Sequence, residues 1–178
     1  GLKFHDTFGP YAFIIYSIAV SLRDLGMTMA PQNAFQTLLG LETLSLRMKK
    51  HVSNARKIAN WLEQHPKIDK VTYAGLKSSK YYDLAKSVLP KGAGALFTIS
   101  LKEGYEACIK MINKLNLFSH VSNLGDTRSL IIHPASTVHR QLTEQQQINA
   151  GLAPNVIRLS IGIEDPKDLI DDLKQALE

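Results

Sequence analysis

Apolar residues recur at helical spacing through the first third of the chain. Steps of three and four residues between apolar positions begin near Pro31 and continue for about eight turns at 3.6 residues per turn, which predicts one long helix that ends before Pro66. A helix of this length more often bridges two packed bodies than stays inside one small domain. A shorter helix is predicted over residues 10–25, because Pro10 suits a first turn and Gly26 can end a helix. The apolar positions of the long helix are Ala34, Leu38, Leu41, Leu44, Met48, Val52, Ala55, Ala59 and Leu62.

Beyond Pro66 the pattern changes to short apolar runs that alternate with amphipathic segments. This alternation predicts an α/β domain with a small sheet of about four strands and helices packed mainly on one face. We therefore expect residues 1–64 to form a helical segment that bridges to another body, and residues 65–178 to form a small carboxy-terminal α/β domain. The strand-like runs are 68–73, 93–101, 118–122, 130–133 and 156–161, and the helical segments are 79–88, 103–115, 143–150 and 166–177.

The composition indicates a globular protein without a membrane or nucleic-acid role. The chain has 178 residues, of which 44% are hydrophobic, so it can bury a core. No apolar run reaches the length that crosses a bilayer, and no signal peptide is recognisable. The single cysteine, Cys108, excludes an internal disulfide framework and indicates a cytoplasmic protein; its place in a predicted amphipathic helix favours a packing role. The net charge is +5, but the scattered lysines favour a solvated basic face over a nucleic-acid groove.

An arginine lies in the middle of the last predicted strand. Arg158 shares one strand face with Val156 and Ser160, while the apolar residues between them point to the other face. Burying a guanidinium group alone is costly, so Arg158 must find an anion or a paired acid. Its planar fork can hold a carboxylate through two parallel hydrogen bonds. An internal salt bridge to Glu164 or Asp126 explains the same pattern equally well.

Two polar segments follow predicted strands. Residues 122–129 contain Asn123, whose amide offers donors and an acceptor, and Gly125, which permits a tight turn; spacing alone favours an ordinary turn here. The histidines at 133 and 139 match no zinc spacing, and no cluster of cysteines or carboxylates accompanies them. We therefore expect His133 and His139 to be hydrogen-bonded within a structural loop, and we expect no metal site.

In their order along the chain, these segments resemble the carboxy-terminal signature of the Cys/Met-metabolism family of pyridoxal-phosphate (PLP) enzymes. The resemblance runs through almost all 178 residues. The opening segment 1–9 and Asn123, where the cystathionine enzymes of the family usually have serine, are similar to the O-acetylhomoserine sulfhydrylase branch. The other matching segments are Leu25-Gly26, Pro31-x-Asn33-Ala34, Gly40–Met48, His51, Asn54-Ala55, Gly92-x-Gly94, Asn123–Asp126, His133–Thr137, His139 and Arg158–Glu164.

The resemblance implies the carboxy-terminal domain of a fold-type I PLP enzyme, with residues 1–64 packed on a large domain that precedes it. By the same resemblance, Arg158 would hold the α-carboxylate of the amino-acid substrate, and Asn123 would help to place that carboxylate or the catalytic lysine. The family's Schiff-base lysine, the aspartate facing the pyridine nitrogen and most phosphate ligands lie upstream of the matching region. The expected cofactor of the complete enzyme is therefore PLP, with no catalytic or cofactor-binding residue in this chain.

The implied reaction is a γ-replacement, in which sulfide or methanethiol displaces acetate from O-acetyl-L-homoserine to give homocysteine or methionine. The alternatives within the family are methionine γ-lyase and cystathionine γ-synthase. A different class of function is a stand-alone α/β domain that binds a carboxylate through Arg158. The family is usually tetrameric, so we expect a homo-oligomer, and the chain alone is expected to be inactive and able to form a dimer.

Overall fold

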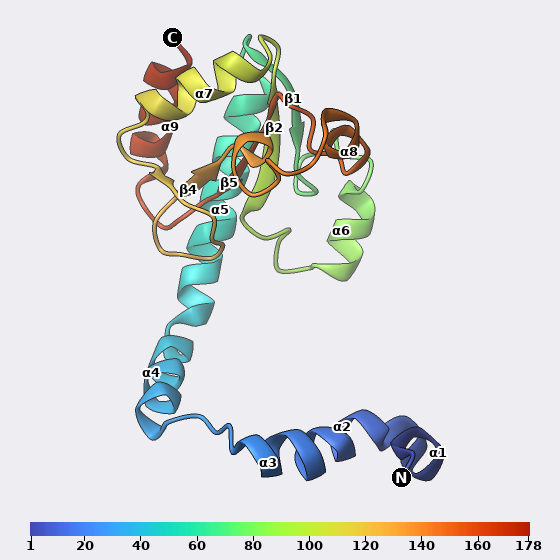
Figure 1. Ribbon diagram of the computed structural model, residues 1–178. Helices are drawn as coiled ribbons and strands as arrows, with labels where there is room; N and C mark the ends of the chain where they lie inside the picture. Colours follow the sequence, from blue (N-terminus) through green and yellow to red (C-terminus); the bar gives the residue numbers. More distant parts are fainter. The chain divides into compact units, whose positions relative to one another are not determined.

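The computed structural model describes residues 1–178 and divides into two compact units, residues 1–44 and residues 45–178 (Figure 1). The first unit is helical, and none of its residues is buried. Gly26 ends its third α-helix in the left-handed conformation, with φ of 63°, as its position in the sequence predicts. No helix in either unit is both long enough and apolar enough to cross a membrane. The helices of the first unit are α1 (Phe4–Phe8), η1 (Gly9–Tyr11), α2 (Ala12–Tyr16), the π-helical η2 (Ser17–Leu22), α3 (Arg23–Leu25) and α4 (Pro31–Glu42).

The predicted long helix is divided in two at Thr43. α4 ends at Glu42 and α5 covers Leu44–Glu63, while Thr43 has φ of −103° and ψ of 3°. Gly40 and Thr43 are both weak helix formers and fall within one turn of each other, which lowers the stability of the helix there. The prediction of one continuous helix is therefore wrong, because the apolar periodicity continues across the break and does not reveal it.

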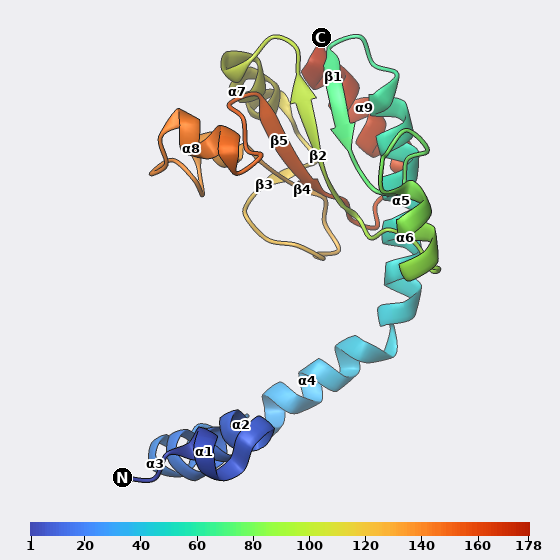
Figure 2. The same ribbon diagram turned by 90° about the vertical axis from the view of Figure 1, so that its right-hand side faces the viewer.

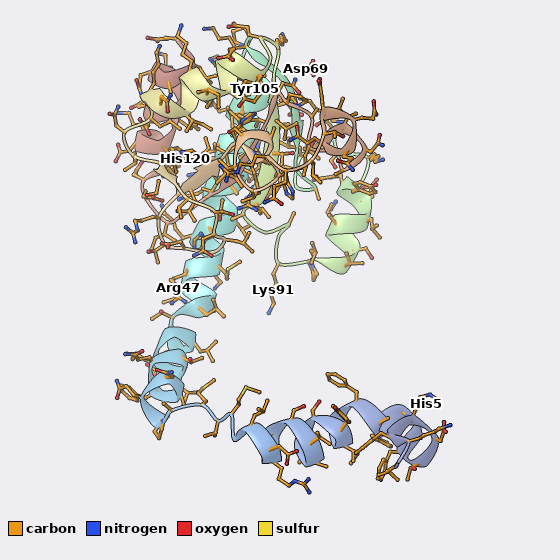
Figure 3. The ribbon with its side chains drawn as sticks, viewed as in Figure 1. His5, Arg47, Asp69, Lys91, Tyr105 and His120 are labelled. Atoms are coloured by element: carbon orange, nitrogen blue, oxygen red, sulfur yellow. The ribbon has the colours of Figure 1, made fainter.

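The second unit contains a five-stranded sheet in the order β1-β2-β5-β4-β3 (Figure 2). Neighbouring strands are antiparallel, except that β3 and β4 run parallel. The α/β class is confirmed, with five strands instead of about four. The strand predicted over 118–122 is the two-residue β3 at one edge of the sheet, and β1 forms the other edge; Asp69 on β1 and His120 on β3 are labelled in Figure 3. The strands are β1 (Ile68–Thr72), β2 (Leu96–Leu101), β3 (Ser119–His120), β4 (Leu130–Ile132) and β5 (Val156–Ser160).

One face of the sheet carries the hydrophobic core, as predicted. Ile157 and Leu159 on β5 are fully buried against apolar residues of α5, α7 (Tyr105–Lys114) and α9 (Pro166–Leu177). The remaining short helices are α6 (Tyr82–Val88), η3 (Pro134–Ser136) and α8 (Glu144–Asn149). The helical contributions to this core are Ala55, Ile58, Ala59 and Leu62 from α5, Cys108, Met111 and Ile112 from α7, and Leu169, Leu173, Ala176 and Leu177 from α9.

The opposite face of the sheet is more polar. Because side chains alternate along a strand, Arg158 and Ser160 on β5 point away from the helical layer. Their antiparallel partner β2 places Thr98 directly across from Arg158, and β4 places Ile132 on its other side. The alternation predicted for this strand is confirmed. It gives the sheet one apolar face that packs against the helices and one face that carries hydrogen-bonding groups.

A buried carboxylate ties α9 to the segment that leads into β3. Asp172 accepts hydrogen bonds from the backbone N–H groups of Asn116 (3.0 Å), Leu117 (2.8 Å) and Phe118 (3.3 Å). Its side chain is buried, so these three donors and the carboxylate satisfy one another away from water. The end of α7 is thereby fixed on the surface of α9.

We expect Asp172→Asn to lower the free energy of unfolding by about 1–3 kcal/mol, because an amide nitrogen cannot accept the hydrogen bonds that one carboxylate oxygen accepts. The neighbouring Asp171 is exposed, so Asp171→Asn is a matched control with little expected effect. Urea unfolding of the two variants and the parent protein measures the difference. Equal stability of all three would contradict the role assigned to Asp172.

Candidate substrate-binding site

Arg158 has no acidic partner. Its Nη2 lies 3.5 Å from Ser122 Oγ and 3.4 Å from the carbonyl oxygen of Asn123, and no carboxylate lies within ion-pair distance. Both contacts are longer than a typical N–H···O hydrogen bond. Since a guanidinium group has five N–H donors, most of the hydrogen-bonding capacity of Arg158 is unused within the chain.

The alternative of an internal salt bridge is wrong for both acids that the sequence suggested. Glu164 binds Ser129 through both of its carboxylate oxygens. Asp126 Oδ1 lies 3.7 Å from Nε of Arg128 and accepts a hydrogen bond from the Arg128 backbone N–H at 3.0 Å. That backbone hydrogen bond is the main reason why the pKa of Asp126 lies below its usual value, with the charge of Arg128 contributing. Both acids are therefore engaged in shaping the loop beside Arg158.

Asn123 lies next to Arg158 at the start of this loop. Its carbonyl oxygen receives the long hydrogen bond from Arg158, and its Oδ1 accepts a hydrogen bond from the backbone N–H of Leu124 at 2.9 Å. This second bond joins adjacent residues, and the backbone of the loop bends at Ser122, Leu124 and Gly125. The Nδ2 group of Asn123 is exposed and makes no hydrogen bond within the chain. Arg158 and Asn123 thus bring unused N–H donors to one place.

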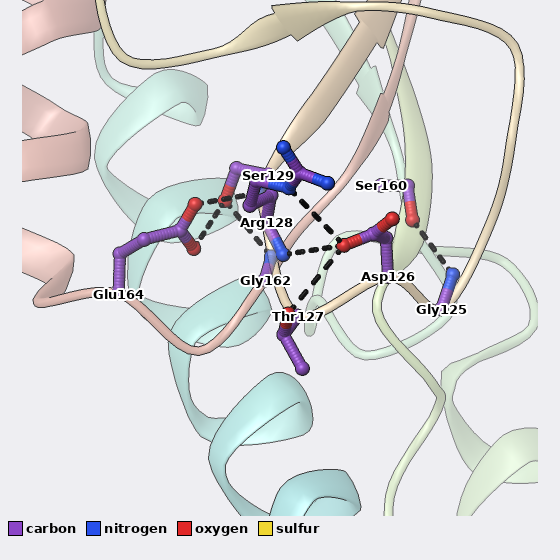
Figure 4. Close-up of polar contacts among 8 residues, drawn as sticks. All are labelled: Gly125, Asp126, Thr127, Arg128, Ser129, Ser160, Gly162 and Glu164. Atoms are coloured by element: carbon purple, nitrogen blue, oxygen red, sulfur yellow. Dashed lines mark hydrogen bonds and ion pairs between the residues drawn. The ribbon is translucent and has the colours of Figure 1, made fainter. Parts of the chain in front are cut away.

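Glu164 clamps the far end of the 122–129 loop (Figure 4). Its Oε1 accepts a hydrogen bond from the backbone N–H of Ser129 at 2.5 Å, and its Oε2 accepts one from Ser129 Oγ at 2.9 Å. Ser129 Oγ in turn accepts a hydrogen bond from the backbone N–H of Gly162 at 2.8 Å. We call Glu164, Ser129 and Gly162 the clamp. It fixes the loop to the segment that leaves β5.

A second attachment lies closer to Arg158. The hydroxyl of Ser160, two residues along the same strand face, accepts a hydrogen bond from the backbone N–H of Gly125 at 3.2 Å. Gly125 has φ of 73°, a conformation that glycine adopts without strain. The loop is therefore held at Gly125 by β5 and at Ser129 by the segment that follows β5, and Asn123 lies beside Arg158 ahead of these two attachments.

Gly162 is required by close backbone packing. A Cβ atom at this position would lie 2.6 Å from the carbonyl carbon of Arg128 and would also overlap the carbonyl oxygen of Thr127. That same Thr127 oxygen accepts a hydrogen bond from the backbone N–H of Ile163 at 2.9 Å. The loop can approach the end of β5 this closely only because residue 162 has no side chain.

His133 has a structural role, as predicted. Its Nε2 donates a hydrogen bond to the carbonyl oxygen of Pro154 at 2.7 Å, and its Nδ1 lies 2.9 Å from Ser136 Oγ. The ring of Tyr105 packs edge-on at 4.8 Å between centroids, and Tyr105 can be located in Figure 3. Burial is the main cause that lowers the pKa of His133, opposed by the bond to Pro154.

Two residues that match the family in sequence, but to which the pattern assigned no role, support the end of β5. His51 and Asn54 on α5 are buried, and they bind the backbone carbonyl groups of residues 161, 162 and 164 through His51 Nδ1 (2.6 Å) and Asn54 Nδ2 (3.1 and 2.8 Å). The sequence pattern could have indicated this role, because both are polar residues that lie next to the apolar positions of a helix that packs on the core. Cys108, by contrast, belongs to the core, where burial raises the pKa of its thiol to about 12.

We expect Gly162→Ala to lower the free energy of unfolding by about 1–3 kcal/mol, since the added methyl group forces the 127–128 backbone away from β5. Amide hydrogen exchange at Ser129 and Ile163 should become faster in this variant. Gly40→Ala is the matched control, because a Cβ atom there meets open space within a helix and should be neutral or slightly stabilising. Unchanged exchange in Gly162→Ala would contradict this account.

The lowered pKa of His133 predicts an acid-sensitive contribution to stability. Because the folded state keeps the imidazole neutral, its contribution is fully present above the unfolded pKa of about 6.5 and is lost as the pH falls below that value. His133→Gln should therefore lose less stability than the parent protein between pH 7.5 and about pH 5. His5→Gln, at an exposed position, is the matched control. Urea unfolding of the parent and the two variants at each pH measures the free energy of unfolding. The same loss of this free energy between the two pH values in all three proteins would refute the prediction.

Comparison with known proteins gives the site its context. A family model described as Cys/Met metabolism PLP-dependent enzyme matches residues 12–178. The chain is 45% identical to O-acetyl-L-homoserine sulfhydrylase 1 of Thermus thermophilus, over 99% of this chain and 42% of that protein. It is 44% identical to homocysteine synthase of Schizosaccharomyces pombe, over 100% of this chain and 42% of that protein.

A solved structure shares the fold. The crystal structure of a Campylobacter jejuni protein assigned as an O-acetylhomoserine (thiol)-lyase, which carries a pyridoxyl-lysine phosphate group, superimposes with a TM-score of 0.86 at 46% identity. The match covers 99% of this chain and 42% of that one. The chain thus spans less than half the length of the relatives it matches. Since the family model covers nearly every residue, the chain belongs to the Cys/Met metabolism family of PLP-dependent enzymes.

Proposed function

We propose that this chain is the carboxy-terminal part of a PLP-dependent transferase that makes homocysteine or methionine from O-acetyl-L-homoserine and sulfide or methanethiol. The observation that carries the proposal is Arg158, a cation without an acidic partner on the polar face of the sheet. The support for the reaction class is the 45% identity to a sulfhydrylase over almost the whole chain.

Arg158 would bind the α-carboxylate of O-acetyl-L-homoserine. A guanidinium group and a carboxylate match in geometry, since two parallel N–H donors meet two oxygens. The contacts of Arg158 with Ser122 and Asn123, at 3.5 and 3.4 Å, are long enough to be exchanged for a carboxylate at little cost. Those contacts also restrict the side chain, which lowers the entropy lost on binding.

Asn123 would act with Arg158 on the same substrate. Its Nδ2 is unbonded, and its backbone is held by the attachments at Gly125 and Ser129, so the amide can donate a hydrogen bond to the substrate carboxylate without moving the loop. The amide is uncharged, so it would orient the carboxylate while Arg158 supplies the attraction.

The residues around Arg158 do not themselves make a site for the cofactor. The backbone N–H of Gly125 is bound to Ser160 and that of Ser129 to Glu164, so this loop does not offer a set of free N–H groups to a phosphate. Bound PLP supplies an electron sink for negative charge at the substrate α and β carbons. In this proposal, the lysine and the phosphate ligands come from a preceding domain, and the chain alone is inactive.

Residues 1–64 would pack against that preceding domain and bridge to the small domain, which residues 65–178 would form. The first unit buries no residue, although a monomeric surface rarely leaves many large apolar side chains in water. The complete enzyme would be a cytoplasmic homo-oligomer, and the same exposed apolar surface would favour a dimer of the chain alone. The exposed side chains include Phe13 at 81%, Tyr11 at 68%, Leu25 at 69%, Phe35 at 60% and Leu38 at 62%.

The test uses the complete enzyme with PLP. Arg158→Ala should raise the KM for O-acetyl-L-homoserine roughly 10- to 100-fold, as expected for the loss of a charge-assisted hydrogen bond of about 1.5–3 kcal/mol. Arg158→Lys should recover part of this loss, because it keeps the charge without the fork. Arg140→Ala, an exposed position, is the control.

The donor and product identify the reaction. The parent enzyme should consume O-acetyl-L-homoserine with sulfide or methanethiol and should prefer either to cysteine. A preference for cysteine would indicate a cystathionine γ-synthase, and release of methanethiol from methionine would indicate a γ-lyase. Unchanged KM in Arg158→Ala would remove the role proposed for Arg158 whichever reaction is found.

A further inference from the structure

A cavity lies between α5 and α6 in the unit formed by residues 45–178. Its volume is about 560 Å³, within the usual range for small-molecule sites. Val52, Arg56, Asn60 and Glu63 line it from α5, at steps of three and four residues that place them along one face of the helix. One face of α6 lines the opposite wall. No residue of the Arg158 site lines this cavity, so what it binds does not depend on the proposed function.

Tyr73 is a buried aromatic residue in the lining of the cavity. Its hydroxyl donates a hydrogen bond to the carbonyl oxygen of Gly94 at 2.8 Å. Burial raises the pKa of Tyr73, and the nearby charge of Arg56 opposes this rise. Tyr73 is therefore a neutral part of the lining whose one donor is already used, and Arg56 lines the same cavity.

The two ends of the cavity differ in polarity. At one end, Val52 packs against Gly92 so closely that a Cβ atom on the glycine would overlap it, and Leu89 and Pro90 complete an apolar wall. At the other end, Glu63 accepts a hydrogen bond from Ser78, which brings the neighbouring Lys77 to that end. Eleven residues of helix separate Val52 from Glu63, which corresponds to about 16 Å.

Three cations line the cavity without an acidic partner. Arg56, Lys77 and Lys86 form no ion pair, although Lys86 Nζ lies 5.4 Å from the ring centroid of Tyr82. Glu63 is the only acidic residue of the lining, and it is engaged with Ser78. Three like charges around one space repel one another, and a bound anion would remove that repulsion.

We propose that this cavity binds a nucleoside di- or triphosphate. Its phosphates would contact Arg56, whose fork suits phosphate oxygens, and the lysines, which act as point charges. Its base would lie at the apolar end formed by Val52, Leu89 and Pro90. Inorganic phosphate would leave that end empty, and a molecule with a single carboxylate would leave two of the three cations unpaired.

The experiment is calorimetric titration of the complete PLP-loaded protein with ADP, ATP, adenosine and pyrophosphate at constant ionic strength. The filled cofactor site prevents ADP from competing for it. ADP should bind, and adenosine and pyrophosphate should each bind at least about tenfold more weakly, because each engages one end only. Arg56→Gln and Lys77→Gln should each weaken ADP binding about tenfold or more. Arg56→Lys should restore part of the affinity.

Lys57→Gln is the matched control, since Lys57 follows Arg56 on α5 but does not line the cavity. Its ADP affinity should stay within about a factor of two of the parent value. Absence of ADP and ATP binding would overturn the proposal. Two other results would also overturn it, because each indicates attraction by net charge alone: pyrophosphate that binds as tightly as ADP, and a Lys57→Gln variant that loses as much ADP affinity as Arg56→Gln. If Arg56→Gln unfolds, Lys77→Gln in the loop after Gly75 carries the same test.

Discussion

The carboxylate of Glu164 receives two hydrogen bonds from Ser129, and much of the site's geometry depends on this pair. The residues are 35 positions apart in sequence, yet their contact fixes the end of the 122–129 loop that leads into β4. Ser129 Oγ also accepts a hydrogen bond from the backbone N–H of Gly162. Because Gly162 has no side chain, the loop can lie directly against the end of β5. Without the clamp, the loop would be held to β5 only through the Gly125–Ser160 bond and the long contacts of Arg158 with Ser122 and Asn123.

Helix α5 holds the same strand end from the core side. His51 and Asn54 bind three carbonyl groups between Ile161 and Glu164, so this irregular stretch is fixed by polar bonds beneath as well as by the clamp beside it. The arrangement has a cost, because Oδ1 of Asn54 is buried without a hydrogen-bond partner. An unpaired buried acceptor destabilises by roughly 1–3 kcal/mol, which the two bonds from Nδ2 must offset.

The periodic pattern of the sequence predicted the parts of the fold that repeat. Apolar alternation located the strands and the polar face that carries Arg158, because side-chain direction along a strand follows from position alone. Contacts between distant residues have no such pattern. The sequence therefore left Glu164 and Asp126 as equal candidates to pair with Arg158, whereas each is bound to another residue of the 122–129 loop. The break at Thr43 was missed for a similar reason, since it is shorter than the repeat that reveals a helix. The apolar run at 118–122 did predict β3, although the strand itself is only two residues long.

The edges of the sheet limit how copies of this chain can associate. β1 carries the charged residues Asp69 and Lys70 and has a register shift between Ile68 and Lys70, and β3 at the other edge is only two residues long. Short, charged or irregular edge strands offer a poor template for pairing with another strand. The sheet is thereby protected against growing by intermolecular strand addition, so self-assembly that leads towards fibres is disfavoured, and association through helical surfaces is left as the open route.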